Sequence, residues 1–225
     1  MVLKVQGFED LFEPSAEDGD SLLFFGNRQM PGYEPPLDCF DDFKTNGINP
    51  NLWTKTIAAP GTISVSNGIA LLSVLGAGSA KLKMDIGKNL ADYSAIHVTM
   101  KVKFEFGAAD PMFDDELIVG FTNAAENKYS WFRYASATYG AAQMVWEISD
   151  GAMAAPVAHS VVEGKWYNLE FYMNAAGSWF KFLGYKTTSA KTWTDEVFLF
   201  FYSPWASGMV DPVRIYIDKC LMEAL

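Results

Sequence analysis

Aromatic and hydrogen-bonding residues alternate along two neighbouring segments, and their types suit the binding of a ligand. In YSWFRY, the side chains of Tyr129, Trp131 and Arg133 fall on one side of an extended chain, because successive residues of a β-strand point to opposite faces. In the next segment, AQMVWEIS, Gln143 and Glu147 share one side for the same reason. Flat rings stack on the apolar faces of sugars, while amide, carboxylate and guanidinium groups bond their hydroxyls. If the two sides coincide, they form a shallow glycan-binding patch.

The alternative interpretation is that Trp131, together with Trp146 of the second segment, belongs to the core, since tryptophan is highly buried on average. Trp205 differs from both because it lies in FYSPWASGMVDP, whose Pro and Gly residues predict a loop. Loops on a rigid scaffold often carry binding residues, so Trp205 is a further candidate for contact with a ligand.

The acidic residues do not form the pair that glycoside hydrolysis needs. Retaining glycosidases place two carboxylates about 5–5.5 Å apart at the scissile bond. Asp114 and Glu116 would share one face of a strand, but the next residue on that face is Ile118. Glu147 and Asp150 are three positions apart, so on a regular strand they face opposite ways. We therefore expect solvated or turn acids and assign no catalytic residue.

Histidine, cysteine and serine give no recognisable nucleophile. The two histidines, His97 and His159, are expected at the surface, and neither cysteine, Cys39 or Cys220, has a histidine close by in the sequence. The G-x-S-x-G elbow of α/β-hydrolases is missing. So few His and Cys residues also argue against a zinc site.

Calcium has more candidate ligands, because Ca²⁺ binds hard oxygen atoms and acidic residues are plentiful. We expect no cofactor, and a structural Ca²⁺ stays open as an alternative. The acidic residues do not have the spacing of an EF-hand loop. Its candidate ligands form two groups: Asp110, Asp114 and Asp115, and Asp41, Asp42 and Asp218.

The elements that must position these residues are β-strands. Residues 96–106, IHVTMKVKFEF, alternate apolar and polar without error, which predicts a long strand with one buried face. TISVS and IALLSV flank Asn67-Gly68, a dipeptide typical of a type I′ hairpin. Similar runs separated by turn residues give about twelve strands in all, with at most single helical turns such as residues 88–93. Regular antiparallel strands without crossover helices predict a sandwich or barrel.

The composition excludes several classes of protein. The chain has 225 residues, half of them hydrophobic and 15% aromatic, which suffices for the core of one large β-domain. Its net charge of −10 would be repelled by nucleic acid and by anionic lipid. No apolar window of about 18 residues predicts a transmembrane helix. The start, MVLKVQGFEDLFEP, meets acids and Pro too early for a signal peptide, so we expect retention, prior trimming, or exit by another route such as a virion.

Residues 1–37 differ from the rest of the chain. They are rich in acids and contain MPGYEPPLD, whose prolines continue neither helix nor strand. Inside them, MVLKVQGF and SLLFFGN predict two short strands. Two interpretations stay open: an extension packed against the main domain, or an arm that docks on a neighbouring subunit. Cys39 and Cys220 also leave two alternatives, a disulfide between adjacent first and last strands or two buried thiols.

Four segments resemble concanavalin A-like lectin/glucanase domains, which include the LamG-like jelly rolls. DCFDDFKTNGINPNLWTKTI and ISVSNGIALLSV are similar to the opening of such domains, with an acid-acid-Phe start, a later Trp and an Asn-Gly hairpin. VVEGKWYNLEFYMN looks like the G-x-W strand, and VRIYIDKCLM looks like the last strand with its Ile-Asp pair. The residues that carry the resemblance are Asp41, Asp42, Phe43, Trp53, Asn67, Gly68, Gly164, Trp166, Tyr167, Ile217 and Asp218.

The resemblance covers about residues 38–225 and implies a two-sheet jelly roll. Its families include lectins, glycan-binding modules, glycoside hydrolases, polysaccharide lyases and virion or cell-surface proteins, so fold alone does not choose a function. The laminarinase-like branch would carry E-x-D-x-E or E-x-D-x-x-E on one strand, and the alginate-lyase-like branch Gln-x-His. Neither motif occurs in this sequence, which favours a non-catalytic branch.

We predict an all-β, antiparallel jelly-roll sandwich over residues 38–225, preceded by an extension over residues 1–37. The expected function is a non-catalytic recognition or structural module of a virion or extracellular surface assembly, with a glycan or neighbouring subunits as partners and homo-oligomers formed through the extension. The alternatives are a stand-alone glycan-binding module and, after it, a hydrolase or lyase of the same fold. The predicted ligand-binding residues are Tyr129, Trp131, Arg133, Gln143, Glu147 and Trp205.

Overall fold

The structure is a computed structural model, and it describes residues 39–45, 47–84, 87–106, 114–135, 143–151, 157–204 and 212–225. The chain divides into two units, Met1–Pro35 and Pro36–Leu225, of which only the second contains described residues. The expected extension with its two short strands, and the candidate residue Trp205, therefore lie outside the described part of the chain.

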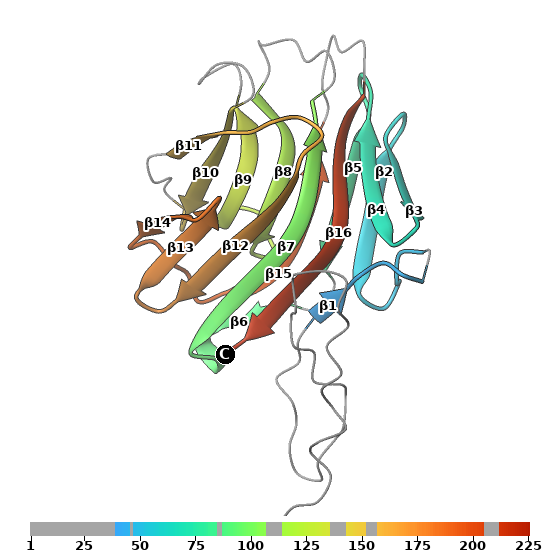
Figure 1. The fold of residues 1–225 in the computed structure, drawn as a ribbon. Coiled ribbons are helices and arrows are strands. Elements are labelled where there is room, and N and C mark those ends of the chain that lie inside the picture. The colour runs from blue at the N-terminus through green and yellow to red at the C-terminus, as the bar shows by residue number, and fades with distance from the viewer. Residues whose placement is uncertain are drawn as a thin grey trace, which may run out of the picture. The chain divides into compact units, whose positions relative to one another are not determined.

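Two antiparallel β-sheets form the described unit, one in front of the other in Figure 1. We call them sheet A and sheet B. The strand order in sheet A is β14 (Tyr185–Ser189), β13 (Gly177–Phe182), β12 (Trp166–Asn174), β7 (Ala95–Glu105), β16 (Val213–Ala224), β4 (Ile69–Val74) and β3 (Thr62–Ser66), and β1 (Cys39–Asp41) also pairs with β16. The order in sheet B is β11 (Val157–Ser160), β10 (Gln143–Ser149), β9 (Tyr129–Ala135), β8 (Asp114–Thr122), β15 (Glu196–Ser203), β5 (Ser79–Met84) and β2 (Trp53–Ala58), and β6 (Lys88–Asn89) also pairs with β15.

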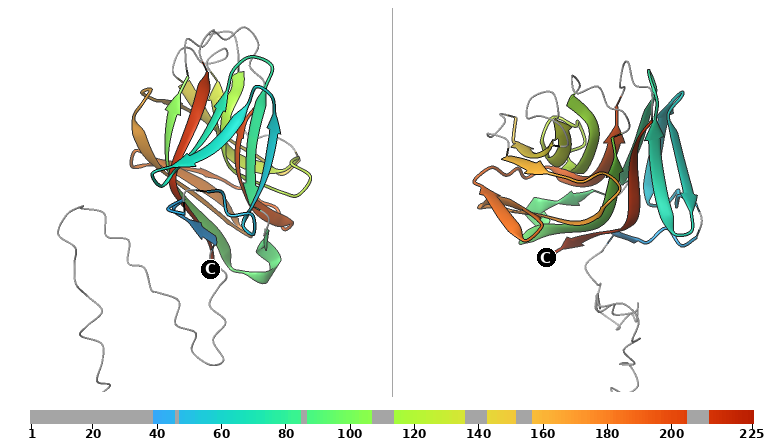
Figure 2. Two further views of the ribbon diagram at one scale, coloured as in Figure 1. Left: turned by 90° about the vertical axis from the view of Figure 1, so that its right-hand side faces the viewer. Right: turned by 45° about the horizontal axis from the view of Figure 1, so that its top comes forward.

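The two sheets end at matching edges. Strands β3 and β2 close sheets A and B on one side, which Figure 1 shows at the right and which faces the viewer in the left view of Figure 2. Strands β14 and β11 close them on the other side. The prediction of an all-β, antiparallel two-sheet sandwich is confirmed.

The core lies between the sheets and follows the alternation of the sequence. Along β7, five apolar side chains from Ile96 to Phe104 are buried, and the residues between them face outward. Aromatic rings of the two sheets meet in the middle of this core. Phe132 of β9 lies 4.9 Å from Phe180 and 5.1 Å from Phe182, both of β13, between ring centroids. The long strand predicted at residues 96–106 is thereby confirmed and placed next to β12 and β16.

The local turn predictions are also confirmed. Asn67 and Gly68 both have positive φ angles, 53° and 74°, as a type I′ turn between β3 and β4 requires. The helical turn expected near residues 88–93 is a 3₁₀ turn over Leu90–Asp92. The structure has more strands than the predicted twelve, because elements such as β1 and β6 are too short to show a period in the sequence. Among the described residues, no helix has the length and apolarity needed to cross a membrane.

The first and last described strands lie side by side, as expected for a sandwich. In the pairing of β1 with β16, Cys39 is opposite Met222 and Cys220 is opposite Asp41. The buried Cys220 thiol lies 3.9 Å from the carbonyl oxygen of Asp41. The register thus gives each cysteine a different cross-strand neighbour, and the two alternatives, a disulfide or two buried thiols, stay expectations.

Candidate functional site

The outward surface of sheet B carries aromatic residues that core packing does not explain. On β9 the residues Ser130, Phe132 and Tyr134 are buried towards sheet A, and on β15 so are Val197, Leu199 and Phe201. Since neighbours along a strand alternate, the residues between them point away from sheet A. We call this surface, with five aromatic side chains, the aromatic face; they are Tyr129, Trp131, Phe198, Phe200 and Tyr202.

The two sets of residues that alternation groups in the sequence come together on this face. The register of β9 with β10 sets Trp131 opposite Glu147. A nitrogen of Arg133, Nη2, lies 2.6 Å from Oε1 of Glu147, and the indole nitrogen of Trp131 donates to Oε2 at 3.2 Å. The side chain of Glu147 is only 3% exposed. Its buried charge is therefore held by one cation and one indole N–H.

The tryptophans of these two strands lie on opposite sides of sheet B. Trp131 lies on the aromatic face and is half-buried, so its assignment to the core is wrong. Trp146 is a core residue, 2% exposed, and its indole nitrogen donates to Ser130 Oγ at 3.0 Å. Gln143 lies on the same side of β10 as Glu147 but at the far end, where its amide donates to Ser160 Oγ of β11. It is thus apart from the Arg133–Glu147 pair.

A stack of three rings forms the centre of the aromatic face. The ring centroids of Tyr129 and Trp131 lie 3.6 Å apart with planes 11° from parallel, and those of Trp131 and Phe200 lie 6.4 Å apart. Gly120 of β8 is the cross-strand neighbour of both Trp131 and Phe200. A Cβ atom on Gly120 would come within 2.6 Å of the Cα of Trp131. The absence of a side chain at this position lets the rings approach across β8.

Two lysines of β5 extend the face beyond β15. The ammonium group of Lys81 lies 5.2 Å from the ring centroid of Tyr202 and 5.7 Å from that of Phe200, and that of Lys83 lies 4.8 Å from Phe198. Such distances allow cation–π attraction. Positive charges therefore lie directly over the aromatic side chains.

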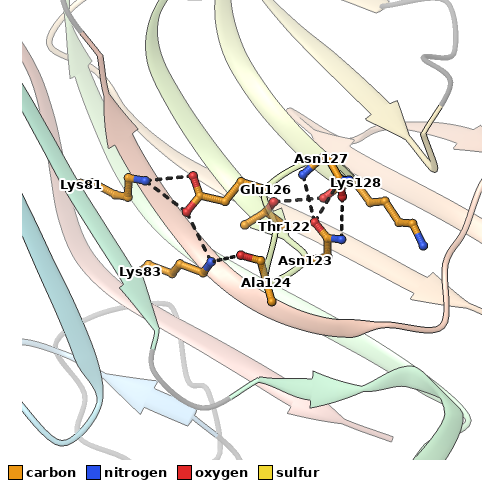
Figure 3. Close-up of polar contacts among 8 residues, drawn as sticks. All are labelled: Lys81, Lys83, Thr122, Asn123, Ala124, Glu126, Asn127 and Lys128. Atoms are coloured by element: carbon orange, nitrogen blue, oxygen red, sulfur yellow. Dashed lines mark hydrogen bonds and ion pairs between the residues drawn. The ribbon is translucent and has the colours of Figure 1, made fainter.

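Glu126, in the turn between β8 and β9, reaches across β15 to both lysines (Figure 3). Lys81 Nζ lies 2.9 and 3.1 Å from the two carboxylate oxygens, and Lys83 Nζ lies 3.3 Å from one of them. Burial alone would raise the pKa of Glu126. The hydrogen bonds and charge of Lys81, helped by the charge of Lys83, outweigh it and hold the pKa below its usual value.

The turn that carries Glu126 is fixed by side chains within it. Asn123 Oδ1 accepts hydrogen bonds from the backbone N–H groups of Asn127 and Lys128, and Thr122 Oγ1 donates to the carbonyl oxygen of Lys128 (Figure 3). Glu126 itself has a φ of 57°, in the left-handed region. The sequence analysis missed this cluster, because a contact between a turn and β5 across an intervening strand leaves no periodic signal.

Other acids named from the sequence are engaged in separate contacts. Asp150 accepts from Lys191 at 2.8 Å, beyond the end of β10. Asp41 accepts from the indole nitrogen of Trp53 at 2.7 Å, and Asp42 and Asp218 form ion pairs with Lys44 and Lys101. In the part of the chain that the structure describes, no group of three or more His, Cys, Asp or Glu residues is placed to hold a metal ion. The remaining calcium candidates, Asp110 and the side chains of Asp114 and Asp115, lie outside that part.

The histidines differ from expectation in one case. His97 lies on the outward side of β7, where its Nδ1 is 3.0 Å from a carboxylate oxygen of Glu223. His159 does not lie on a polar surface as expected. It points inward from β11 towards three phenylalanine rings, with centroids 5.3–5.9 Å away, and burial lowers its pKa. Its place opposite Met144 of β10 explains this, since Met144 is a core residue.

Comparison with known proteins identifies the fold. No protein-family profile and no curated protein matches the sequence. Among solved structures, the carbohydrate recognition domain of Emp47p matches with a TM-score of 0.61 at 10% identity, over 83% of this chain and 94% of that chain. A Bacillus licheniformis β-glucanase matches with a TM-score of 0.59 at 10% identity, over 84% of this chain and 98% of that one. The CBM2 module of the evolved Dit of Lactobacillus casei BL23 phage J-1 matches with a TM-score of 0.56 at 14% identity, over 82% and 94%.

These matches show that the chain has the concanavalin A-like jelly-roll fold, which the sequence predicts. The same fold is shared by recognition domains and by glucanases. It does not by itself assign catalysis, because function depends on the site that a fold carries.

Proposed function

We propose that this protein is a non-catalytic carbohydrate-binding module that holds a glycan on the aromatic face of sheet B. The observation that carries the proposal is the set of five aromatic side chains on the outward side of sheet B, of which four are partly exposed and the fifth, Phe200, is buried. Aromatic residues that do not pack a core are typical of recognition surfaces, where ring faces meet apolar parts of the ligand. Sugars offer such apolar faces together with hydroxyl groups.

The polar groups around the rings suit those hydroxyls. Arg133 lies beside Trp131 and is paired with the buried Glu147, while Lys81 lies over Phe200 and Tyr202 and Lys83 over Phe198. Glycan recognition combines such hydrogen-bonding groups with ring platforms. The names of two similar structures, a carbohydrate recognition domain and a CBM2 module, support this class of ligand.

The state of Glu147 favours binding over hydrolysis. Hydrolysis of a glycoside needs an acid and a base or nucleophile about 5–9.5 Å apart. Glu147 is occupied by Arg133 and Trp131, and its neighbours on the outward side of β10, Val145 and Ser149, carry no carboxylate. Glucanases share the fold, so the experiment must also test whether the wild-type chain hydrolyses the saccharides that it binds.

The proposal is tested on a glycan array, followed by calorimetric titration of the saccharides that bind. Trp131→Ala and Tyr129→Ala should each weaken binding about tenfold, because stacked rings at a binding surface contribute about 1–2 kcal/mol. The matched control is Trp179→Ala, which removes a ring stacked on Tyr172 at the outward side of sheet A. Trp131→Phe keeps a ring and should retain most of the affinity.

Three results would contradict the proposal. One is an array on which no saccharide binds the wild-type chain. A second is equal loss of affinity in Trp179→Ala and Trp131→Ala, with both variants folded by circular dichroism. The third is release of reducing ends from a bound saccharide, abolished by Glu147→Gln, which would make the protein a glycoside hydrolase.

A further inference from the structure

The ion pair between the lysines of β5 and Glu126 differs from the cross-strand lysine pairs of sheet A. On the outward side of sheet A, Lys181 pairs with Glu170, its direct neighbour across the strands β12 and β13. Lys101 likewise pairs with Asp218 on the adjacent strand β16. Cross-strand neighbours are the usual source of such pairs. Lys81 and Lys83 instead receive their carboxylate from a turn, across the whole width of β15.

Charge is also unbalanced at this cluster. Two ammonium groups share the single carboxylate of Glu126, and both lie over the rings of the aromatic face. In a chain with a net charge of −10, two lysines with one carboxylate between them carry a local excess of positive charge. Lys83 is further oriented by a hydrogen bond to the carbonyl oxygen of Ala124 (Figure 3).

The carboxylate of Glu126 is partly exposed to solvent, so that a group of a ligand can take its place. The side chain of Glu126 is 33% exposed, while those of Lys81 and Lys83 are 24% and 17% exposed. Its release requires movement of one side chain of the turn and leaves the strands in place. An ion pair of this exposure is weak, because water and salt screen it. An anionic group of a ligand can therefore replace the carboxylate of Glu126 at little cost in free energy.

We propose that the Lys81–Lys83 pair is the subsite for the acid group of an anionic saccharide, and that Glu126 occupies this subsite in the free protein as an internal substitute that the ligand displaces. The proposal rests on the proposed function, since the rings of the aromatic face hold the sugar to which the acid group belongs. The acid group is a carboxylate, as in uronic acids, or a sulfate ester. The two share the negative charge and the oxygen acceptors that ammonium groups bind.

The test compares matched saccharides and matched variants. Neutral oligosaccharides are titrated beside their uronic-acid and their 6-O-sulfated counterparts. The wild-type chain should bind one acidic form more tightly than the neutral form, and the preference should fall as salt rises. Glu126→Gln should strengthen binding of the acidic form about fivefold and leave the neutral form unchanged, because a partly exposed ion pair no longer competes.

Variants of the lysines complete the design. Lys81→Met and Lys83→Met should abolish the preference for the acidic form, whereas Lys181→Met on sheet A should leave it intact. The uronic-acid and sulfate arms distinguish which acid group is recognised. The inference is overturned if Glu126→Gln weakens both forms equally, since Glu126 would then only fasten the turn.

The outcomes separate this inference from the function on which it rests. If neutral and acidic saccharides bind alike and depend on Trp131, the glycan-binding role holds and the inference fails. If the acidic form depends on the lysines while Trp131→Ala has no effect, the anion subsite holds and the aromatic platform fails. If no saccharide binds, both are overturned.

Discussion

At the scale of single residues, the carboxylate of Glu147 is the most constrained charge of the candidate site. Burial of an ionised carboxylate is unfavourable unless a cation or hydrogen bonds compensate it. Arg133 provides the cation and Trp131 an N–H group. Arg133 therefore stabilises the fold as well as the proposed binding surface, and the two effects must be separated by measurement.

We expect Arg133→Met to lower the free energy of unfolding by about 3 kcal/mol, because it leaves Glu147 buried without a cation. The double variant Arg133→Met/Glu147→Gln should lose less, since the uncompensated charge is removed as well. Urea unfolding of both variants beside the wild-type chain measures the difference. A double variant less stable than Arg133→Met would show that the carboxylate is stabilised by other groups.

At the scale of elements, strand β8 determines how closely its neighbours approach. β8 lies between β9 and β15, and Gly120 is the point at which the rings of both neighbours meet. It has a φ of 150°, and a Cβ atom there would lie 2.3 Å from the carbonyl oxygen of Ser130. The backbone of β9 would have to shift to admit any side chain.

Gly120→Ala should therefore displace Trp131, weaken glycan binding and lower the free energy of unfolding by about 2–3 kcal/mol. Gly151→Ala is the matched control, because Gly151 also has a positive φ, 113°, but no atom lies within 4 Å of its added Cβ. Thermal unfolding and saccharide titration of both variants separate backbone strain from the steric clash. Equal effects of the two substitutions would remove the role that we assign to the space at Gly120.

His159 of strand β11 should make the stability of the sandwich depend on pH. Burial lowers its folded-state pKa below the ordinary value of 6.5, so the unfolded chain binds the proton first as pH falls. The free energy of unfolding should therefore decrease as pH falls from about 7, until the folded-state pKa is reached. Carboxylates with lowered pKa values, such as Glu126 and Glu105, act only at lower pH.

Replacement of the imidazole isolates this effect. His159→Leu should lose less stability than the wild-type chain between pH 7 and 5, and thermal unfolding at several pH values measures the loss. His97→Gln is the control, because His97 lies on the outward side of β7 beside Glu223. An unchanged pH dependence in His159→Leu would show that other groups cause it.

At the scale of the whole molecule, the expected assembly role depends on residues 1–37, which lie outside the described part of the chain. We propose that this segment docks on a neighbouring subunit, in the setting of a virion or a cell surface. Light scattering of the full chain and of a chain that begins at Leu37 should give an oligomer and a monomer, respectively. Two monomers would contradict the assembly role.

The sequence alone determined the local features of this protein. Strict alternation predicted the long strand at residues 96–106, and Asn67-Gly68 predicted the hairpin between β3 and β4. Alternation along two further segments placed Trp131 on the same side as Arg133, and Glu147 on the same side as Gln143. These predictions hold because strand period and turn geometry depend on residues close in the chain. His159 was misplaced because an edge strand of four residues, β11, shows too little of its period.

Only the tertiary structure decided which of these surfaces coincide. The order of strands in sheet B brings β5 beside β15 and β15 beside β8, although long stretches of sequence separate them. The meeting of Lys81 and Lys83 with Glu126, and of Trp131 with Phe200 over Gly120, follows from that order. Strand order depends on the joint burial of all inward faces between two sheets, a property of the whole core that no local pattern of residues encodes.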